Sequence, residues 1–223
     1  MRLRKNPKVN EKIKQFEDFV TTKEQSPFIA EEKIGKWKQS FENQTSELYV
    51  ELGTGKGDFI SQLAESTPDK NFIGIEMQQD VIYVAAKKIR ALNLKNVRLI
   101  VYDINLIENL FAEHEIDRLY INFCDPWPKK RHAKRRLTHE LFLEKYRRLL
   151  VPNGEIHFKT DNPGLFEFSL EQFKNLGLAV SELSFDLHAD IELGKFTGNI
   201  ETEYERKFSG LGEKIFRCVV KFP

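Results

Sequence analysis

Short apolar runs recur along the chain from residue 48 onward, separated by stretches whose apolar residues follow helical spacing. The runs cover residues 48–52, 72–75, 97–101, 119–123 and 156–158. Runs of this length between helical stretches are typical of strands that are covered on both faces. One intervening stretch carries Val81, Ile89 and Leu92 at helical spacing. Regular alternation of strand and helix predicts right-handed βαβ crossovers.

The pattern therefore predicts an α/β fold with a mostly parallel, seven-stranded sheet and helices on both faces. Two later strand-like runs, residues 179–187 and 215–222, complete this sheet. We expect them to form a hairpin-like antiparallel edge pair. Asn162-Pro163 predicts a helix start and Gly177 a helix end, because Asn caps helices, Pro fits the first turn and Gly adopts the left-handed conformation.

The first 45 residues are predicted to form a basic extension with helices, ahead of a main domain at residues 46–223. Six cations precede residue 15 against one acid, Glu11: Arg2, Arg4, Lys5, Lys8, Lys12 and Lys14. Val9, Ile13, Phe16 and Val20 follow helical spacing, and Ile34, Trp37 and Phe41 indicate a second helix. The basic arm is either a solvated terminus or a contact for RNA phosphates.

Composition narrows the class of protein. The chain has 223 residues, 31% charged residues and a net charge of only +1, so any affinity for nucleic acid must come from local clusters. Cys124 and Cys218 form no CxxC pair, which favours a reducing compartment over a zinc site or disulfides. No apolar run is long enough to span a membrane. We therefore expect a cytoplasmic protein that binds no membrane, and no obligatory protein partner is evident.

Carboxylates follow the predicted strands one after another. They are Glu51, Glu76, Asp103, Asp125 and Asp161. A single acid at such a place is usually a turn residue or a helix cap. In an open parallel sheet, however, ligands bind at the carboxyl ends of the strands. Five acids at five strand ends therefore predict a ligand site along that edge.

The first of these turns, residues 51–57, reads Glu-Leu-Gly-Thr-Gly-Lys-Gly. Glycines at this place let the backbone pass close to a bound nucleotide. Glu51 would repel a pyrophosphate but suits an amino group, and Glu76 lies about 20 residues on, where an acid commonly binds ribose hydroxyls. This pattern favours S-adenosylmethionine over a dinucleotide, with Asp103 receiving the adenine amino group.

The stretch from Tyr120 to Arg136 concentrates the remaining chemistry. Asp125 is followed by Trp127 between two prolines, which stiffen the backbone, and six of residues 129–136 are Lys or Arg. A rigid carboxylate and an aromatic ring beside a dense cationic run indicate a site for a base on a phosphate backbone. Trp127 is either a stacking platform for that base or a core residue.

Longer motifs carry a family resemblance. They are Asp-Pro-Trp-Pro-Lys-Lys-Arg-His at residues 125–132, His-Phe-Lys-Thr-Asp-Asn at 157–162 and Thr-Glu-Tyr-Glu at 202–205. With the glycine turn, they make the chain resemble the bacterial tRNA (guanine-N7)-methyltransferases, which implies a Rossmann-like class I methyltransferase fold. The resemblance implies transfer of a methyl group from S-adenosyl-L-methionine to N7 of the guanosine at tRNA position 46, in the variable loop.

The same resemblance implies roles for individual residues. The donor site comprises Glu51, Gly53, Gly55, Gly57, Glu76, Asp103 and Asp125. Asp125 is also the catalytic residue. The substrate contacts are Lys129, Asp161, Thr202, Glu203, Tyr204 and Glu205. The RNA-interaction segment comprises Arg131, His132, Ala133, Lys134, Arg135 and Arg136.

Two other functions share parts of this pattern. A dinucleotide-dependent oxidoreductase would have the same sheet, but its glycine spacing differs and an acid before the turn does not suit it. A non-catalytic RNA-binding module would keep the cations without needing acids at the strand ends. No metal is expected, because neither His132 nor His139 has an acid or cysteine at ligand spacing. A methyltransferase is therefore the prediction.

Overall fold

The structure is a computed structural model that describes residues 8–223, apart from the side chains of residues 29–31. Arg2, Arg4 and Lys5 of the predicted basic arm lie outside the described residues. The chain forms two compact units, Met1–Ile116 and Asp117–Pro223, and each is described by itself below. Among residues 8–223, no helix is both long and apolar enough to cross a membrane.

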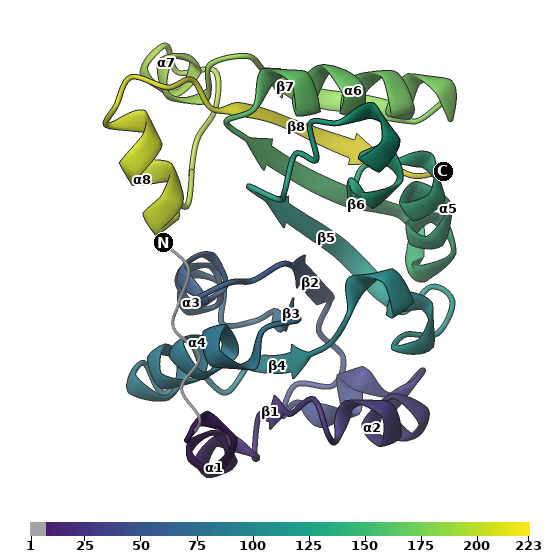
Figure 1. Ribbon diagram of the computed structural model, residues 1–223, viewed down its shortest axis with the longest axis vertical. Helices are drawn as coiled ribbons and strands as arrows, with labels where there is room; N and C mark the ends of the chain where they lie inside the picture. The colour runs from purple at the N-terminus through teal and green to yellow at the C-terminus, as the bar shows by residue number, and fades with distance from the viewer. Residues whose placement is uncertain (1–7) are drawn as a thin grey trace. The chain divides into compact units, whose positions relative to one another are not determined.

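The first unit contains four parallel strands in the order β1-β4-β3-β2 (Figure 1). They are β1 (Val20–Thr21), β2 (Leu48–Leu52), β3 (Asn71–Glu76) and β4 (Val97–Val101). Three of them follow the predicted apolar runs, and their residues are almost all buried. β1 was not predicted, since Val20 continues the helical spacing of the N-terminal region.

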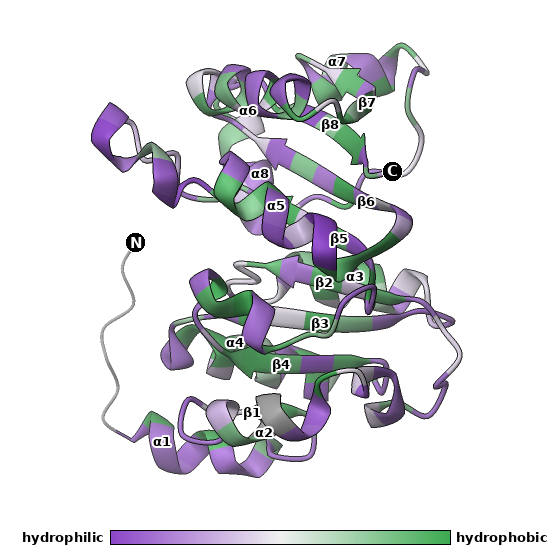
Figure 2. Cartoon of the chain, turned by 90° about the vertical axis from the view of Figure 1, so that its right-hand side faces the viewer, coloured by the Kyte–Doolittle hydropathy of each residue, from purple (hydrophilic) through white to green (hydrophobic). Residues whose placement is uncertain are grey.

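Helices α3 (Asp58–Ser66) and α4 (Gln79–Ala91) connect these strands as predicted. Each buries one apolar stripe, which on α4 includes Ile82, Ala85 and Ile89. Figure 2 shows both hydrophobic and hydrophilic segments on α4, as expected for a helix that packs on a sheet and faces solvent. The 3₁₀ helix η3 (Ile104–Asn109) follows β4.

The N-terminal region packs on the first unit. α1 (Val9–Lys12) and η1 (Ile13–Phe16) form the predicted apolar face, and the ring of Phe16 lies 5.9 Å from that of Tyr83 on α4. α2 (Ser26–Lys33) and the 3₁₀ helix η2 (Trp37–Ser40) follow. The predicted second helix is thus only a short 3₁₀ turn. The carboxylate of Glu115 anchors it by accepting from the amides of Gly35 (2.9 Å) and Trp37 (2.8 Å).

The second unit contains four strands in the order β5-β6-β8-β7. They are β5 (Ile116–Asn122), β6 (Leu150–Thr160), β7 (Ala179–Ser184) and β8 (Phe216–Lys221). β5 and β6 run in the same direction, and β8 is antiparallel to both β6 and β7 (Figure 1). The described residues thus form eight strands rather than seven.

The expected antiparallel edge pair is confirmed. β7 and β8 pair antiparallel at one edge of these four strands, with β7 outermost, but their connection is longer than a hairpin turn. The chain between them contains α7 (Leu187–Glu192) and α8 (Glu203–Ser209), neither of which was predicted. Strand order depends on contacts between distant segments, which local periodicity does not report.

Helices α5 (Glu140–Leu149) and α6 (Pro163–Asn175) complete the second unit. The predicted caps of α6 are confirmed: Oδ1 of Asn162 accepts from the amide of Leu165 at 2.8 Å, and Gly177 has φ +65°. The ring of Phe166 on α6 lies 6.0 Å from that of Phe158 on β6. The core of this unit therefore lies between α6 and the strands beneath it.

Candidate active site

The glycine turn between β2 and α3 has a backbone that only glycine adopts easily. Gly53, Gly55 and Gly57 have φ values of +77°, +55° and +72°. The amides of Gly53 and Thr54 both donate to the carbonyl oxygen of Ile75 at 2.9 Å, which ties the turn to β3. Gly57 also needs space, because a Cβ there would lie 2.8 Å from Cβ of Ala85. The turn is therefore fixed in shape and close to α4.

Glu51 lies at the start of this turn and is held by a neighbouring hydroxyl. Its side chain is 4% exposed, and its Oε2 accepts from Oγ1 of Thr54 at 2.6 Å. A hydrogen bond to a hydroxyl partly offsets the desolvation of the carboxylate. A buried carboxylate beside a glycine turn is suited to an ammonium or hydroxyl ligand and repels a phosphate.

Glu76 and Asp103 end the two neighbouring strands of the first unit. Oε1 of Glu76 accepts from the amide of Gln78 at 2.9 Å. Oδ1 of Asp103 accepts from the amide and the side-chain nitrogen of Asn105, at 2.9 and 2.7 Å. Since β2, β3 and β4 are adjacent and parallel, the structure places Glu51, Glu76 and Asp103 at one edge of this unit. Their predicted location is confirmed.

In the second unit, Asp125 lies in a loop whose backbone is unusual on both sides. Phe123 has φ +52° and Trp127 has φ +41°, values that are uncommon for residues other than glycine. The amide of Phe123 donates to the carbonyl oxygen of Lys159 at 2.9 Å, which fixes the start of the loop to β6. The side chain of Asp125 is exposed. Such conformations persist where surrounding contacts enforce them, and they are frequent at functional sites.

Arg136 holds the part of this loop that follows Asp125. Its guanidinium donates to the carbonyl oxygens of Pro126 (3.0 Å) and Trp127 (3.1 Å) and lies 4.3 Å from the ring centre of Phe168 on α6. Arg135 lies over the Trp127 ring at 4.8 Å. Trp127 itself is half-buried and lies outside the hydrophobic core, so stacking on a base stays a prediction for it.

The remaining cations of the loop are more accessible. The side chains of Lys129, Arg131, Lys134 and Arg135 are exposed, while His132 and Arg136 are half-buried. Residues Lys130–Arg135 form the 3₁₀ helix η4. Exposed cations are free to follow a phosphate backbone. Arg136 differs from these exposed cations, because its guanidinium is hydrogen-bonded to backbone carbonyl oxygens of the loop.

Asp161, directly after β6, meets Tyr204 on α8. The Tyr204 hydroxyl donates to Oδ2 of Asp161 at 3.3 Å, and the Tyr204 ring lies 5.0 Å from that of Phe123. Burial, followed by the charge of Asp161 and a smaller effect of Asp125, raises the pKa of Tyr204 to about 12. The hydroxyl is therefore a donor at physiological pH, and Asp161, Asp125 and Tyr204 lie in one region of the second unit.

The predicted substrate segment, residues 202–205, divides into two kinds of residue. Glu203 and Tyr204 are exposed. Thr202 caps α8 by accepting from the amide of Glu205 at 2.9 Å. The side chain of Glu205 is fully buried and pairs with Lys159 at 2.7 Å. Lys159 was not singled out from the sequence, although a lysine within a buried strand run is an unusual signal.

The thiol next to Asp125 is not activated for chemistry. Burial of the thiol and the adjacent Asp125 carboxylate raise the pKa of Cys124 to about 12, so this thiol stays protonated and unreactive. Among the described residues, no group of three or more His, Cys, Asp or Glu side chains is placed to hold a metal ion.

Comparison with known proteins identifies the family. The profile of a family described as "Putative methyltransferase" matches residues 45–218. A "tRNA (guanine-N(7)-)-methyltransferase" from Geobacillus sp. (strain WCH70) is 46% identical over 223 residues, covering 100% of this chain and 96% of that protein. The chain belongs to the tRNA (guanine-N(7)-)-methyltransferase family. The family resemblance predicted from the motifs is thereby confirmed.

Solved structures of methyltransferases share the fold of this family member. The 16S rRNA methyltransferase KamB has a TM-score of 0.59 at 11% identity, covering 79% of this chain and 88% of that one. A Haemonchus contortus phosphoethanolamine N-methyltransferase, in complex with S-adenosyl-L-methionine, has a TM-score of 0.52 at 14% identity. It covers 80% of this chain and 49% of that one. At such identities the likeness shows the fold alone, and the predicted Rossmann-like methyltransferase fold is confirmed.

Proposed function

We propose that this enzyme transfers the methyl group of S-adenosyl-L-methionine to N7 of a guanosine in tRNA, giving 7-methylguanosine. Family membership supports this proposal. The observation that carries it is local: the Tyr204 hydroxyl donates to Asp161 near Asp125, beside a segment of exposed cations. A purine on a phosphate backbone needs carboxylate acceptors and cations of this kind.

The first unit has the residues that the methyl donor requires. S-adenosyl-L-methionine carries an ammonium, two ribose hydroxyls and an adenine amino group but no phosphate. We assign Glu51 to the ammonium, Glu76 to the ribose and Asp103 to the adenine amino group. Gly53, Gly55 and Gly57 allow the close backbone approach, because their left-handed conformations shape the turn without side chains. When bound, the donor supplies an electrophilic methyl group on a sulfonium.

The second unit has the residues that a guanine base requires. Guanine N7 already carries a lone pair, so the enzyme needs no strong base to start the reaction. As the N7–methyl bond forms, the carbon–sulfur bond breaks and positive charge develops on the purine, which acidifies N1–H. A carboxylate that accepts from N1–H and the exocyclic amine therefore binds the transition state more tightly than the ground state. Asp125 is our candidate for this role, and Asp161 is the second.

Alignment of the reacting atoms completes the mechanism. Holding the guanine N7, the methyl carbon and the sulfur in line contributes about 7–11 kcal/mol in favourable cases. Asp161 and Tyr204 orient the base, and Trp127 is available for stacking. Lys129 and the exposed cations of residues 131–136 bind the tRNA backbone. Since a variable-loop base is usually engaged in tertiary contacts, extruding it costs a few kcal/mol. We place the target at tRNA position 46.

Product analysis tests the proposal. The purified protein is incubated with methyl-labelled S-adenosyl-L-methionine and an unmodified tRNA transcript, and the digested nucleosides are separated by mass spectrometry. We expect the label in 7-methylguanosine, and its loss when position 46 is changed to adenosine. Label in another nucleoside, or tRNA binding without transfer, contradicts the proposal. In a binding assay, NAD should not compete with the donor, as it would if this were a dinucleotide enzyme.

A further inference from the structure

A buried ion pair lies in the interior of the second unit. Nζ of Lys159 on β6 lies 2.7 Å from Oε2 of Glu205 on α8, and the two side chains are 7% and 0% exposed. The partners are 46 residues apart in the chain. Two charges removed from water are stable only with good geometry and further hydrogen bonds. This pair therefore depends on the contacts around it.

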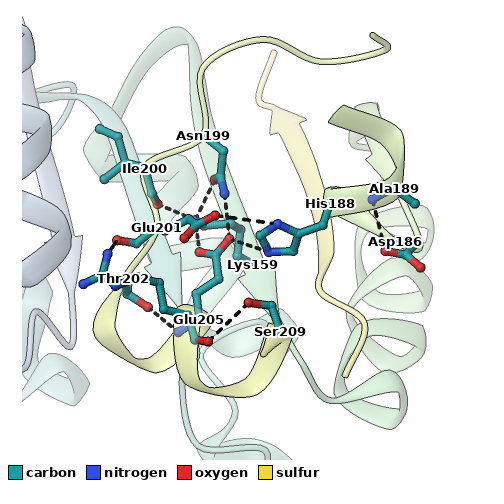
Figure 3. A network of polar contacts seen from close by, with 11 residues as sticks. Lys159, Asp186, His188, Ala189, Asn199, Ile200, Glu201, Thr202, Glu205 and Ser209 are labelled. Atoms are coloured by element: carbon teal, nitrogen blue, oxygen red, sulfur yellow. Dashed lines mark hydrogen bonds and ion pairs between the residues drawn. The ribbon is translucent and has the colours of Figure 1, made fainter. Parts of the chain in front are cut away.

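Most of those contacts come from one segment, residues 199–205, which surrounds the lysine (Figure 3). Nζ of Lys159 donates to Oδ1 of Asn199 (3.1 Å), to the carbonyl oxygen of Ile200 (2.9 Å) and to Glu205. The other oxygen of Glu205 accepts from Nδ2 of Asn199 at 2.7 Å and lies 3.3 Å from Nε2 of His188. Lys159 thus contacts both ends of residues 199–205. This segment has no regular secondary structure before α8 begins at Glu203.

The pair also fixes the residues next to it in sequence. Asp161 lies two positions after Lys159, and Tyr204 lies directly before Glu205. The hydrogen bond between Tyr204 and Asp161 therefore joins α8 to the residue that directly follows β6. The Phe123 ring lies 5.0 Å from the Tyr204 ring and 5.9 Å from Nζ of Lys159. Movement of α8 away from β6 would separate Tyr204 from both Asp161 and Phe123.

We propose that Lys159 and Glu205 form a positioning pair that holds Tyr204 against Asp161, and that Glu205 does not itself contact the guanosine. The inference rests on the proposed function and refines it. Within residues 202–205, Thr202 and Glu205 set the position of the segment. Glu203 and Tyr204, whose side chains are exposed, are left to reach the substrate.

A double-mutant cycle tests the pair. Lys159→Met and Glu205→Met each leave one buried charge without its partner, whereas the double variant leaves neither. Thermal unfolding without tRNA or donor should show that each single variant loses more stability than the double variant. Glu171→Met and Lys174→Met, which change exposed residues of α6, serve as controls for the substitution itself and should hardly change Tm.

Steady-state kinetics then separate positioning from direct contact. We expect each single variant to lower kcat/KM for tRNA by about tenfold or more at saturating donor, with the donor Kd nearly unchanged. The double variant should recover part of this loss. If Glu205 bound the guanosine directly, its loss would persist in the double variant, and the two effects would multiply. That result overturns the inference.

One further variant keeps the test decisive. Glu205→Gln preserves side-chain shape and an oxygen that can accept from Lys159, so it should fold if Glu205→Met does not. Its kcat/KM for tRNA should fall less than that of Lys159→Met; an equal or larger fall at unchanged Tm contradicts the inference. Because the unfolding cycle needs no substrate, it reports on the pair even if the wild-type protein forms no 7-methylguanosine, which would be a failure of the proposed function alone.

Discussion

Nη2 of Arg136 donates to the carbonyl oxygen of Trp127 at 3.1 Å, so an arginine of the cationic segment is bonded to the loop that carries Asp125. Nε of the same side chain donates to Pro126 at 3.0 Å. The planar guanidinium can make both bonds at once, whereas a lysine ammonium has no such fork. Arg136 therefore serves the shape of the loop.

Arg136→Lys should consequently act on the chemical step. The substitution keeps the positive charge but removes the paired hydrogen bonds to the carbonyl oxygens of Pro126 and Trp127. We expect kcat to fall by about tenfold or more, since small misplacements of a catalytic group have effects of this size. The slope of log KM against log salt should stay as in the wild type. The measurement is methyl transfer to tRNA at several salt concentrations.

The matched comparison is the double variant Arg131→Ala/Lys134→Ala, whose side chains are exposed. It should raise KM for tRNA and reduce the salt slope by about 0.7–0.9 for each phosphate that the variant no longer binds, with little change in kcat. If Arg136→Lys and this double variant both change kcat, or both change KM and its salt slope, then Arg136 does not have a separate role in shaping the loop.

Asp125→Asn tests the catalytic carboxylate. The amide keeps the size of the side chain but loses the charge that stabilises a cationic purine. We expect kcat to fall by about 10²–10³, as for the removal of one transition-state interaction, while donor affinity changes little. Single-turnover rates with saturating donor and tRNA provide the measurement. Near-wild-type turnover would exclude Asp125 from this role, and a larger loss in Asp161→Asn would transfer the role to Asp161.

Gly57→Ala tests the donor turn. The residue has φ +72°, and its new Cβ would lie 2.8 Å from that of Ala85, so strain and overpacking add. We expect a loss of about 2–4 kcal/mol of unfolding free energy and weaker donor binding. Gly177→Ala is the control, because it shares the positive φ but has open space around it; about 1–2 kcal/mol should be lost without an effect on the donor. Equal losses in the two variants would contradict the packing argument.

Protonation of His157 should make the free energy of unfolding depend on pH. Burial, followed by the charge of Arg118, lowers the pKa of His157 to about 4, although the hydrogen bond to Glu155 opposes this shift. The unfolded chain takes up this proton near pH 6.5 and the folded chain only near pH 4, so stability falls as pH decreases between these values. The loss amounts to roughly 2 kcal/mol between pH 6.5 and pH 5.

Replacement of His157 by Gln should remove this slope while keeping a donor for Glu155. Urea unfolding of both proteins at pH 7, 6 and 5, values chosen to cross the window of about pH 4 to 6.5, gives the comparison. An identical pH dependence in the two proteins would show that His157 does not carry the effect.

The sequence predicted those elements whose own residues determine them. β2 and β4 follow runs that are apolar at all but one position, and their bounds agree with the structure. α6 carries its own caps at Asn162 and Gly177. β1 has only two residues and pairs with β4, which lies almost 80 residues later in the chain. No local pattern marks such a strand.

The candidate site divides in the same way. Acids at strand ends were predictable, because a parallel sheet brings the ends of its strands to one edge. The environment of each cation could not be predicted from the sequence. Arg136 and Lys134 are indistinguishable in a run of charges, yet one bonds to Pro126 and Trp127 while the other is exposed. The partner of Glu205 lies 46 residues away, so its burial had no signal near residue 205.

Attack by guanine N7 in the variable loop can be tested with one substituted tRNA. A transcript assembled by ligation carries 7-deazaguanosine at position 46 in place of guanosine, which removes the attacking nitrogen and keeps the N1–H and amine that Asp125 would bind. Single-turnover transfer from labelled S-adenosyl-L-methionine is then measured at saturating enzyme. We expect the substituted tRNA to bind and to receive no methyl group. Transfer to it at the rate of the guanosine transcript would show that N7 at position 46 is not the methylated atom.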